Sequence, residues 1–224
     1  MIMSSVATTA TRAAGRQRML ALGGLVLALG VISLPFGTWD HSLASQANMV
    51  ANEFVFWALV AAILLYVTRI ERRPLASIGF IRPRFTDLAI AMAAGLVIVA
   101  MLGVLYLVVF PRLGWDETQQ FQPLMAVPFW LRLVTVVRAA VSEEILFRGY
   151  ALERTRELTG SRAVAGLFTW GVFTIDHLGY WGWHHLVVAG LAGGLLTLLY
   201  LWRGNLWVNI LAHFIIDAVG FLAG

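Results

Sequence analysis

The sequence predicts an all-α fold: a polytopic transmembrane bundle of about seven to eight helices around a polar cavity inside the membrane. Hydrophobic residues make up 60% of the 224 positions and charged residues only 12%. The mean hydropathy of +0.81 lies far outside the range of soluble domains. Apolar runs long enough to cross a bilayer recur along the chain, and a few carboxylate, arginine and histidine side chains interrupt them.

Seven runs approach the roughly 20 apolar residues that a helix needs to span the hydrocarbon core. In chain order they are Met19–Phe36, Val50–Thr68, Leu88–Phe110, Phe129–Tyr150, Val164–Ile175, Leu186–Trp202 and Leu206–Leu222. An eighth piece, tilted or re-entrant, is expected around Leu75–Phe85 or Phe121–Phe129, where proline and glycine interrupt the pattern.

Arginines orient the predicted bundle. They precede the first run, separate the second from the third, and follow the fourth, at Arg12, Arg16, Arg18, Arg69, Arg72, Arg73, Arg82, Arg84, Arg154, Arg156 and Arg162. The positive-inside rule therefore predicts that these segments and the N-terminus are cytoplasmic. Residues 1–18 are expected to form a short disordered arm, and residues 19–224 a single domain whose first run is a retained signal anchor.

Composition excludes several classes of function. The chain contains no cysteine, which rules out a thiol nucleophile, a disulfide framework and a cysteine-ligated metal. The net charge is +4, but the arginines form no dense stripe or aromatic-interleaved patch of the kind that binds nucleic acid. We therefore expect no nucleic-acid partner.

Glu143 and Glu144 stand side by side in VSEEILFRGY, with Arg148 on the next turn. Positions i and i+4 share a helix face, whereas positions i and i+1 diverge by roughly 100°. Glu144 is therefore expected to pair with Arg148, which leaves Glu143 to point elsewhere. An unpaired carboxylate in a low-dielectric site is suited to act as a general base on water. The alternative is a structural ion pair that locks two helices.

A second motif, Phe173-Thr-Ile-Asp-His177, ends the fifth run. Phe173 and His177 are one turn apart, so the phenyl ring can wall the site that the imidazole faces. Asp176 diverges from His177 on a helix and is a poor partner for fixing its tautomer. His184 and His185 follow in a tryptophan-rich stretch and are expected to belong to an interfacial loop.

A third motif, His213-Phe-Ile-Ile-Asp217, lies in the last run. His213 and Asp217 are one turn apart on the same face, so both side chains can reach one cavity. The alternative is a core histidine that is hydrogen-bonded to its own aspartate.

Together, EExxxR, FxxxH and HxxxD, in this order on separate runs, resemble the CPBP family of intramembrane proteases, also called the Abi family, and its type II CaaX prenyl protease branch. Eukaryotic relatives in that family cleave the last three residues from prenylated CaaX proteins. The resemblance covers about residues 75–224, including LASIGF-IRPRF and WRGNLWVNILAH. It implies a helical bundle whose polar cavity opens to one leaflet and laterally to lipid.

The resemblance also implies roles for the motif residues. Glu143, with His177 and His213, would activate the attacking water, while Glu144 and Arg148 would brace the first motif. Many relatives carry asparagine where this chain has aspartate at the last motif position, and an ionised carboxylate cannot donate a hydrogen bond to an oxyanion. Asp217 would therefore be protonated or would hold His213, and the second role is favoured.

Metal dependence is left open by the sequence. His177, His213 and Glu143 could supply the three protein ligands of a catalytic zinc site. The chain nevertheless lacks HExxH, whose two histidines form such a site on a single helix. A glutamate working with two neutral histidines could also deprotonate water without a metal.

The predicted function is therefore an endopeptidase, integral to a bacterial plasma membrane, that cleaves a lipidated or transmembrane peptide near the cytoplasmic side. Two other classes are kept as alternatives: a non-catalytic immunity or scaffold protein that uses the cavity for binding, and a proton-coupled transporter. The absence of an inverted repeat in the sequence argues against the transporter.

Overall fold

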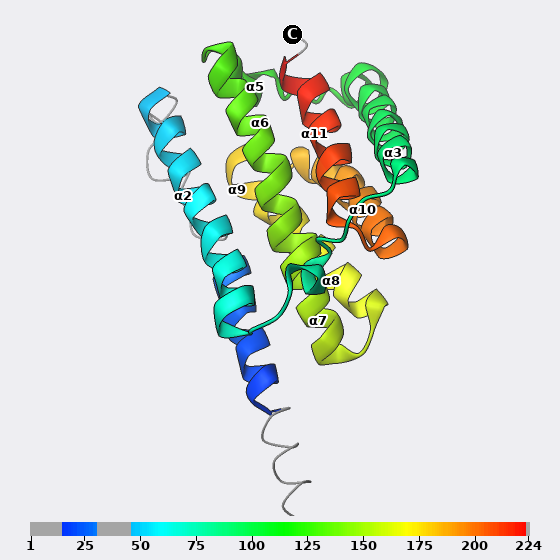
Figure 1. Cartoon of the computed structure of the whole chain (residues 1–224). Helices are drawn as coiled ribbons and strands as arrows, with labels where there is room; N and C mark the ends of the chain where they lie inside the picture. The colour runs from blue at the N-terminus through cyan, green and yellow to red at the C-terminus, as the bar shows by residue number, and fades with distance from the viewer. Residues whose placement is uncertain (1–14, 31–45, 223–224) are drawn as a thin grey trace, which may run out of the picture.

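The computed structural model describes residues 15–30 and 46–222, and the regular elements of these residues are all helices (Figure 1). Residues 15–25 form a helix that continues into η1 (Val26–Gly30). Residues 15–18 of the expected N-terminal arm are thus helical, whereas residues 1–14 of that arm and 31–36 of the first predicted span lie outside the described residues.

Three helical stretches are long and apolar enough to cross a membrane. The first joins α2 (Gln46–Leu65) to η3 (Tyr66–Ile70). The second joins α3 (Phe85–Val104), η5 (Leu105–Val109) and α4 (Phe110–Leu113). The third is α10 (His185–Arg203).

A fourth candidate span combines α5 (Thr118–Met125) with the helix Phe129–Thr159, at a bend of 115°. Pro128 sits at the N-cap of that second helix, where proline is tolerated, and it disfavours helical backbone at the preceding residue. A broken or re-entrant piece therefore lies at 118–129, one of the two places expected for it. The other place holds a single turn of 3-10 helix, η4 (Leu75–Ile78).

The helix Phe129–Thr159 has three parts: α6 (Phe129–Glu143), the π-helical η6 (Glu144–Ala151) and α7 (Leu152–Thr159). All eight residues of η6 are buried. The remaining predicted spans are shorter helices, α8 (Arg162–Asp176) and α11 (Leu206–Leu222). A four-residue helix, α9 (Leu178–Trp181), follows α8.

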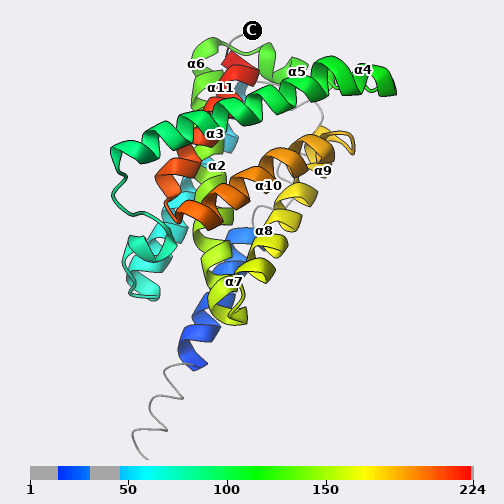
Figure 2. The ribbon, with the colours of Figure 1, turned by 90° about the vertical axis from the view of Figure 1, so that its right-hand side faces the viewer.

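The last helix lies at the centre of the bundle, where α11 packs against α3, α6 and α10. Close approach to α3 requires a small residue, because a Cβ at Gly95 would lie 3.0 Å from the Ala212 carbonyl oxygen. Figure 2 shows α3, α10 and α8 as successive inclined helices, of which α3 and α10 contact α11 and α8 packs against α10. Motifs from α6, α8 and α11 are thereby brought toward one region of the interior.

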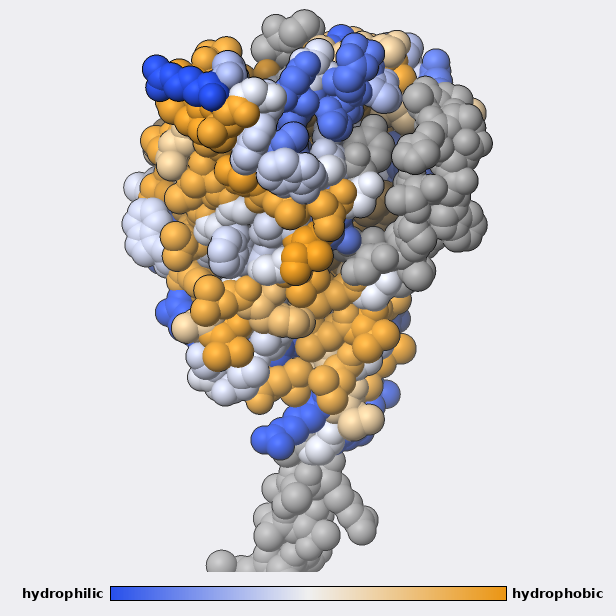
Figure 3. All heavy atoms as spheres, turned by 180° about the vertical axis from the view of Figure 1, so that it is seen from behind, coloured by the Kyte–Doolittle hydropathy of each residue, from blue (hydrophilic) through white to orange (hydrophobic). Residues whose placement is uncertain are grey.

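The outer surface is broadly apolar. Figure 3 shows a wide hydrophobic surface between hydrophilic side chains near the top and the bottom of the molecule. Large side chains such as Phe54, Leu107 and Leu167 are 64% or more exposed, as side chains facing lipid would be. The apolar helices and this surface identify an integral membrane protein.

Two arginine-rich segments meet at one end of the bundle. Arg154 of α7 forms a buried salt bridge of 2.6 Å with Glu71, which follows η3. Arg73 pairs at 2.6 Å with Glu157 of α7. The segment between the second and third predicted spans therefore lies beside the segment after the fourth.

Candidate functional site

The two adjacent glutamates straddle a change of helix type. Glu143 is the last residue of α6 and Glu144 the first of η6, where backbone hydrogen bonds run from i to i+5. Short π-helical segments inside α-helices occur frequently at functional sites. Glu144 is fully buried, whereas the Glu143 side chain is 20% exposed. Neighbouring carboxylates therefore have different surroundings.

Glu144 joins its own helix to α11 through its carboxylate. Its Oε1 accepts hydrogen bonds from Arg148 Nη1 at 2.8 Å and from His213 Nδ1 at 2.9 Å. Its Oε2 accepts a hydrogen bond of 3.1 Å from Asn209 Nδ2. The pairing with Arg148 follows from the i,i+4 spacing, but the bonds to α11 depend on how the helices pack.

Arg148 is 1% exposed and carries this network to α8 and α10. It donates to the Gly193 carbonyl oxygen at 2.9 Å and to Thr197 Oγ1 at 3.4 Å. Its guanidinium carbon lies 4.2 Å from the centre of the Phe173 ring, a cation–π contact. Buried charges need such partners, because an unpaired charge in a low-dielectric interior is costly.

Three carboxylates surround the imidazole of His213. Glu144 accepts from Nδ1, so that Nε2 is the nitrogen facing the others. Nε2 lies 3.5 Å from Asp217 Oδ2 and 3.9 Å from Glu143 Oε2. The second distance is too long for a direct hydrogen bond and suits a bridging water.

His177 follows the last residue of α8 and is fixed by its own helix. Its Nδ1 lies 2.8 Å from the Phe173 carbonyl oxygen. A carbonyl only accepts hydrogen bonds, so Nδ1 carries the proton and the neutral ring keeps a lone pair at Nε2. The Phe173 ring covers one side of the imidazole, with ring centres 4.5 Å apart.

One cavity joins the second and third motifs. It has a volume of about 310 Å³, and we call it the histidine cavity because His177, His185 and His213 line it, together with Asp217 and mainly apolar side chains. Glu143 interacts electrostatically with His177 and Asp217. The structure thus brings Glu143, His177, His213 and Asp217 into one region, while Glu144 and Arg148 lie behind His213.

Three residues of this region were not selected from the sequence. Asn209 stands one turn before His213 on the same helix face, a spacing that could have indicated it. His185 was expected in an interfacial loop, and this prediction was wrong. It is the first residue of α10, is 8% exposed, and its Nδ1 lies 3.0 Å from Glu117 Oε2. No local spacing predicts that bond, because the two residues are 68 positions apart.

The geometry does not favour a metal centre. Among residues 15–30 and 46–222, no three His, Asp or Glu side chains are grouped so that they could hold a metal ion. The candidate ligand set His177, His213 and Glu143 therefore receives no support as a zinc site.

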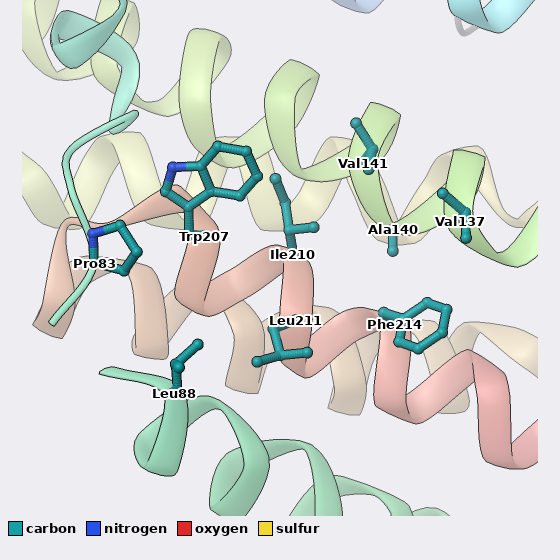
Figure 4. Close-up of a pocket in the computed structure, with 9 residues that line it drawn as sticks. All are labelled: Pro83, Leu88, Val137, Ala140, Val141, Trp207, Ile210, Leu211 and Phe214. Carbon is teal, nitrogen blue, oxygen red and sulfur yellow. The ribbon is translucent and has the colours of Figure 1, made fainter. Parts of the chain in front are cut away.

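A second hollow lies on the other flank of α11 and opens along α6 (Figure 4). This apolar groove has a volume of about 310 Å³ and is lined by Pro83, Leu88, Val137, Ala140, Val141, Trp207, Ile210, Leu211 and Phe214. Ala140 is one turn before Glu143 and Glu144, and Ile210 and Phe214 flank His213 along α11. The apolar groove therefore adjoins the charged residues.

Comparison with known protein families finds a match over the part of the chain that contains these residues. The family model described as "Type II CAAX prenyl endopeptidase Rce1-like" matches residues 125–219, which contain all three motifs. Neither the curated proteins nor the solved structures gave a match. The chain therefore carries, over residues 125–219, a domain of the Rce1-like type II CAAX prenyl endopeptidase family, the family of intramembrane proteases that EExxxR, FxxxH and HxxxD resemble.

Proposed function

We propose that this protein is an intramembrane endopeptidase that hydrolyses a peptide bond near the cytoplasmic side of the membrane. One observation carries the proposal: Glu143 Oε2 and Asp217 Oδ2 both lie within 4 Å of His213 Nε2, while buried Glu144 holds the other ring nitrogen. This arrangement supports the proposal, because hydrolysis needs a base, a histidine and a group that orients the histidine around one point.

Glu143 is the general base in this proposal. It is the one of the two adjacent glutamates that is not committed to Arg148, and its carboxylate faces His213 Nε2. Water held between Glu143 and His213 would lose its proton to Glu143 as its oxygen attacks the scissile carbonyl carbon. The His177 Nε2 lone pair would accept the second hydrogen of the same water and so orient it.

His213 stabilises the oxyanion that the attack creates. Carboxylates face both of its ring nitrogens, which allows the ring to donate from both. Glu144 would hold Nδ1–H while Nε2–H donates to the oxyanion, and Asp217 would keep the ring oriented. Glu143, now protonated, returns its proton to the leaving amine when the carbon–nitrogen bond breaks.

The apolar groove supports a substrate that is anchored in lipid. Its lining is apolar, it lies between helices with lipid-facing side chains, and it adjoins α6 just before Glu143. A lipid chain or a transmembrane segment of a peptide would fit such a surface better than a soluble peptide would. The two arginine-rich segments at one end, joined by Arg154–Glu71 and Arg73–Glu157, support a cytoplasmic orientation for that end and for the N-terminus.

The test is cleavage of a library of lipid-modified peptides by purified protein in detergent, followed by mass spectrometry. Glu143→Gln keeps the shape of the side chain and removes the base, so turnover should fall about 10²–10⁴-fold with an unchanged circular dichroism spectrum. Glu157→Gln is the matched control, because the Glu157 side chain is 36% exposed and pairs with Arg73 and Arg154 rather than with a residue of the histidine cavity. It should retain full turnover.

A chelator separates the metal-dependent mechanism from the proposed one. Turnover should persist in excess 1,10-phenanthroline, because the described residues offer no three-ligand site. Loss of turnover that added zinc restores would overturn the metal-free mechanism. Absence of cleavage of every peptide, by folded protein, would instead favour the non-catalytic binding class.

A further inference from the structure

A buried hydrogen bond joins Glu117 to His185, one of the residues that line the histidine cavity. Glu117, at the N-cap of α5, is 4% exposed and accepts hydrogen bonds from His185 Nδ1 at 3.0 Å and Tyr106 Oη at 2.9 Å through one oxygen, Oε2. A carboxylate only accepts, so the His185 proton bonded to Glu117 is on Nδ1. Glu117 thereby fixes how the His185 ring is turned.

The ring of His185 is parallel to two other rings. It lies at an interplanar angle of 19° and a centre-to-centre distance of 4.8 Å from Trp181. It lies at 11° and 6.1 Å from His177. His177 in turn has Phe173 on another side at 4.5 Å. Phe173, His177, His185 and Trp181 thus form a continuous series of rings, of which the first three line the histidine cavity.

We propose that Glu117 and His185 are positioning residues for His177. Glu117 orients His185, and the His185 ring, held parallel to His177, fixes the plane in which the His177 Nε2 lone pair faces the cavity. The hydrogen bond from His177 Nδ1 to the Phe173 carbonyl still allows the imidazole to tilt about that bond. A parallel ring on the cavity wall removes this freedom, and small displacements of a catalytic group can cost about 10²-fold in rate.

The expected effect of His185 on turnover rests on the proposed function, whereas its effect on the orientation of His177 can be tested without any substrate. Protein labelled with ¹⁵N-histidine is studied by NMR in detergent micelles, with the His177 signals assigned from a His177→Gln sample. The native protein should show His177 as the single tautomer protonated at Nδ1. In His185→Ala the Phe173 carbonyl still holds the Nδ1 proton, so the tautomer should persist, but the His177 ring signals should shift and broaden because the ring is free to tilt.

His184→Ala is the matched control. His184 is the adjacent histidine, and its ring contacts Trp115 and Trp183 rather than His177. The His177 signals should be unchanged in this variant. Unchanged His177 signals in His185→Ala as well would overturn the proposal.

Three further variants keep the test decisive if His185→Ala fails to fold. His185→Phe retains a flat ring for the series and should keep more of the native His177 signal than His185→Leu, which has no ring. Equal signals in the Phe and Leu variants would contradict a role for the ring. Glu117→Gln keeps an acceptor for His185 and Tyr106 and should leave the His177 ring signals native.

Kinetics supply the second readout. With a cleaved lipid-modified peptide, His185→Ala should lower kcat about 10–100-fold with little change in KM, because His177 acts on water rather than on substrate affinity. A rise in KM alone would contradict positioning of His177. If no peptide is cleaved by the native protein, the proposed function fails while the NMR result still decides the positioning role.

Discussion

Glu144 accepts a 2.9 Å hydrogen bond from Nδ1 of His213, a residue 69 positions later in the chain. The carboxylate therefore joins the helix of the first motif to that of the third. The same oxygen also accepts a hydrogen bond from Arg148. The buried carboxylate of Glu144 therefore both pairs with an arginine of its own helix and orients the histidine. Loss of this side chain should consequently damage both stability and turnover.

Glu144→Ala is expected to lower the free energy of unfolding by about 3–5 kcal/mol, because it leaves Arg148 as a buried charge without its counterion. Denaturant unfolding in micelles measures the loss. Arg73→Ala, which breaks a pair that is about a third exposed, should cost no more than about 1 kcal/mol. Comparable losses in the two variants would mean that the buried network contributes little.

Asp217→Asn is expected to keep turnover within about tenfold of the native protein, whereas Asp217→Ala should lose substantially more. The asparagine oxygen can still accept from His213 Nε2, from which Asp217 Oδ2 is 3.5 Å away, and alanine cannot. Initial rates with one cleaved peptide decide between these outcomes. An asparagine variant as inactive as the alanine variant would show that the negative charge itself is needed.

Gly193→Ala tests how closely the site is packed. A Cβ at Gly193 would lie 2.6 Å from a Phe173 ring carbon and 3.3 Å from Arg148 Nη2, so both side chains must move. Stability is expected to fall by about 1–3 kcal/mol, and turnover should fall with it. Gly190→Ala on the same helix is the control, because its Cβ would make only an ordinary 3.5 Å contact with Thr174. That variant should be neutral or slightly stabilising, since alanine favours helix. Equal effects at the two glycines would argue against close packing behind the site.

The apolar groove can be tested with two valines of α6. Val137→Trp should fill the groove and raise KM for a lipid-modified peptide, whereas Val134→Trp should not, because Val134 is equally exposed but does not line the groove. The two variants are compared on the same peptide. If both have native KM values, the substrate's lipid chain binds elsewhere.

Much of the fold follows from local features of the sequence. Apolar runs and their flanking arginines place the helices, and the spacing of Glu144 and Arg148 predicts their salt bridge, because both depend on residues within a turn or a span of each other. The lengths of the spans were harder to predict. Three stretches are long enough to cross a membrane, and a bent pair makes a fourth, whereas α8 and α11 are shorter helices of 15 and 17 residues.

The motif residues proposed to carry the chemistry were selected from the sequence because charged groups in apolar helices are costly unless they have a use. The residues that form hydrogen bonds around these motifs were not selected from the sequence. Asn209 lies four residues before His213 on the same helix face, so its spacing could have indicated it. His185 was expected in an interfacial loop but instead pairs with Glu117 inside the bundle. Nothing within a few residues of His185 indicates that pair.

The sequence by itself determined the helical class, the membrane environment and the positions of the three motifs, since periodicity and the cost of burying charge act locally. Only the tertiary structure decided that Glu144 rather than Asp217 holds Nδ1 of His213, that Glu143 faces Nε2, and that His185 lies parallel to His177. These are contacts between helices, and they depend on how ridges, small residues and buried charges fit together after the chain has packed.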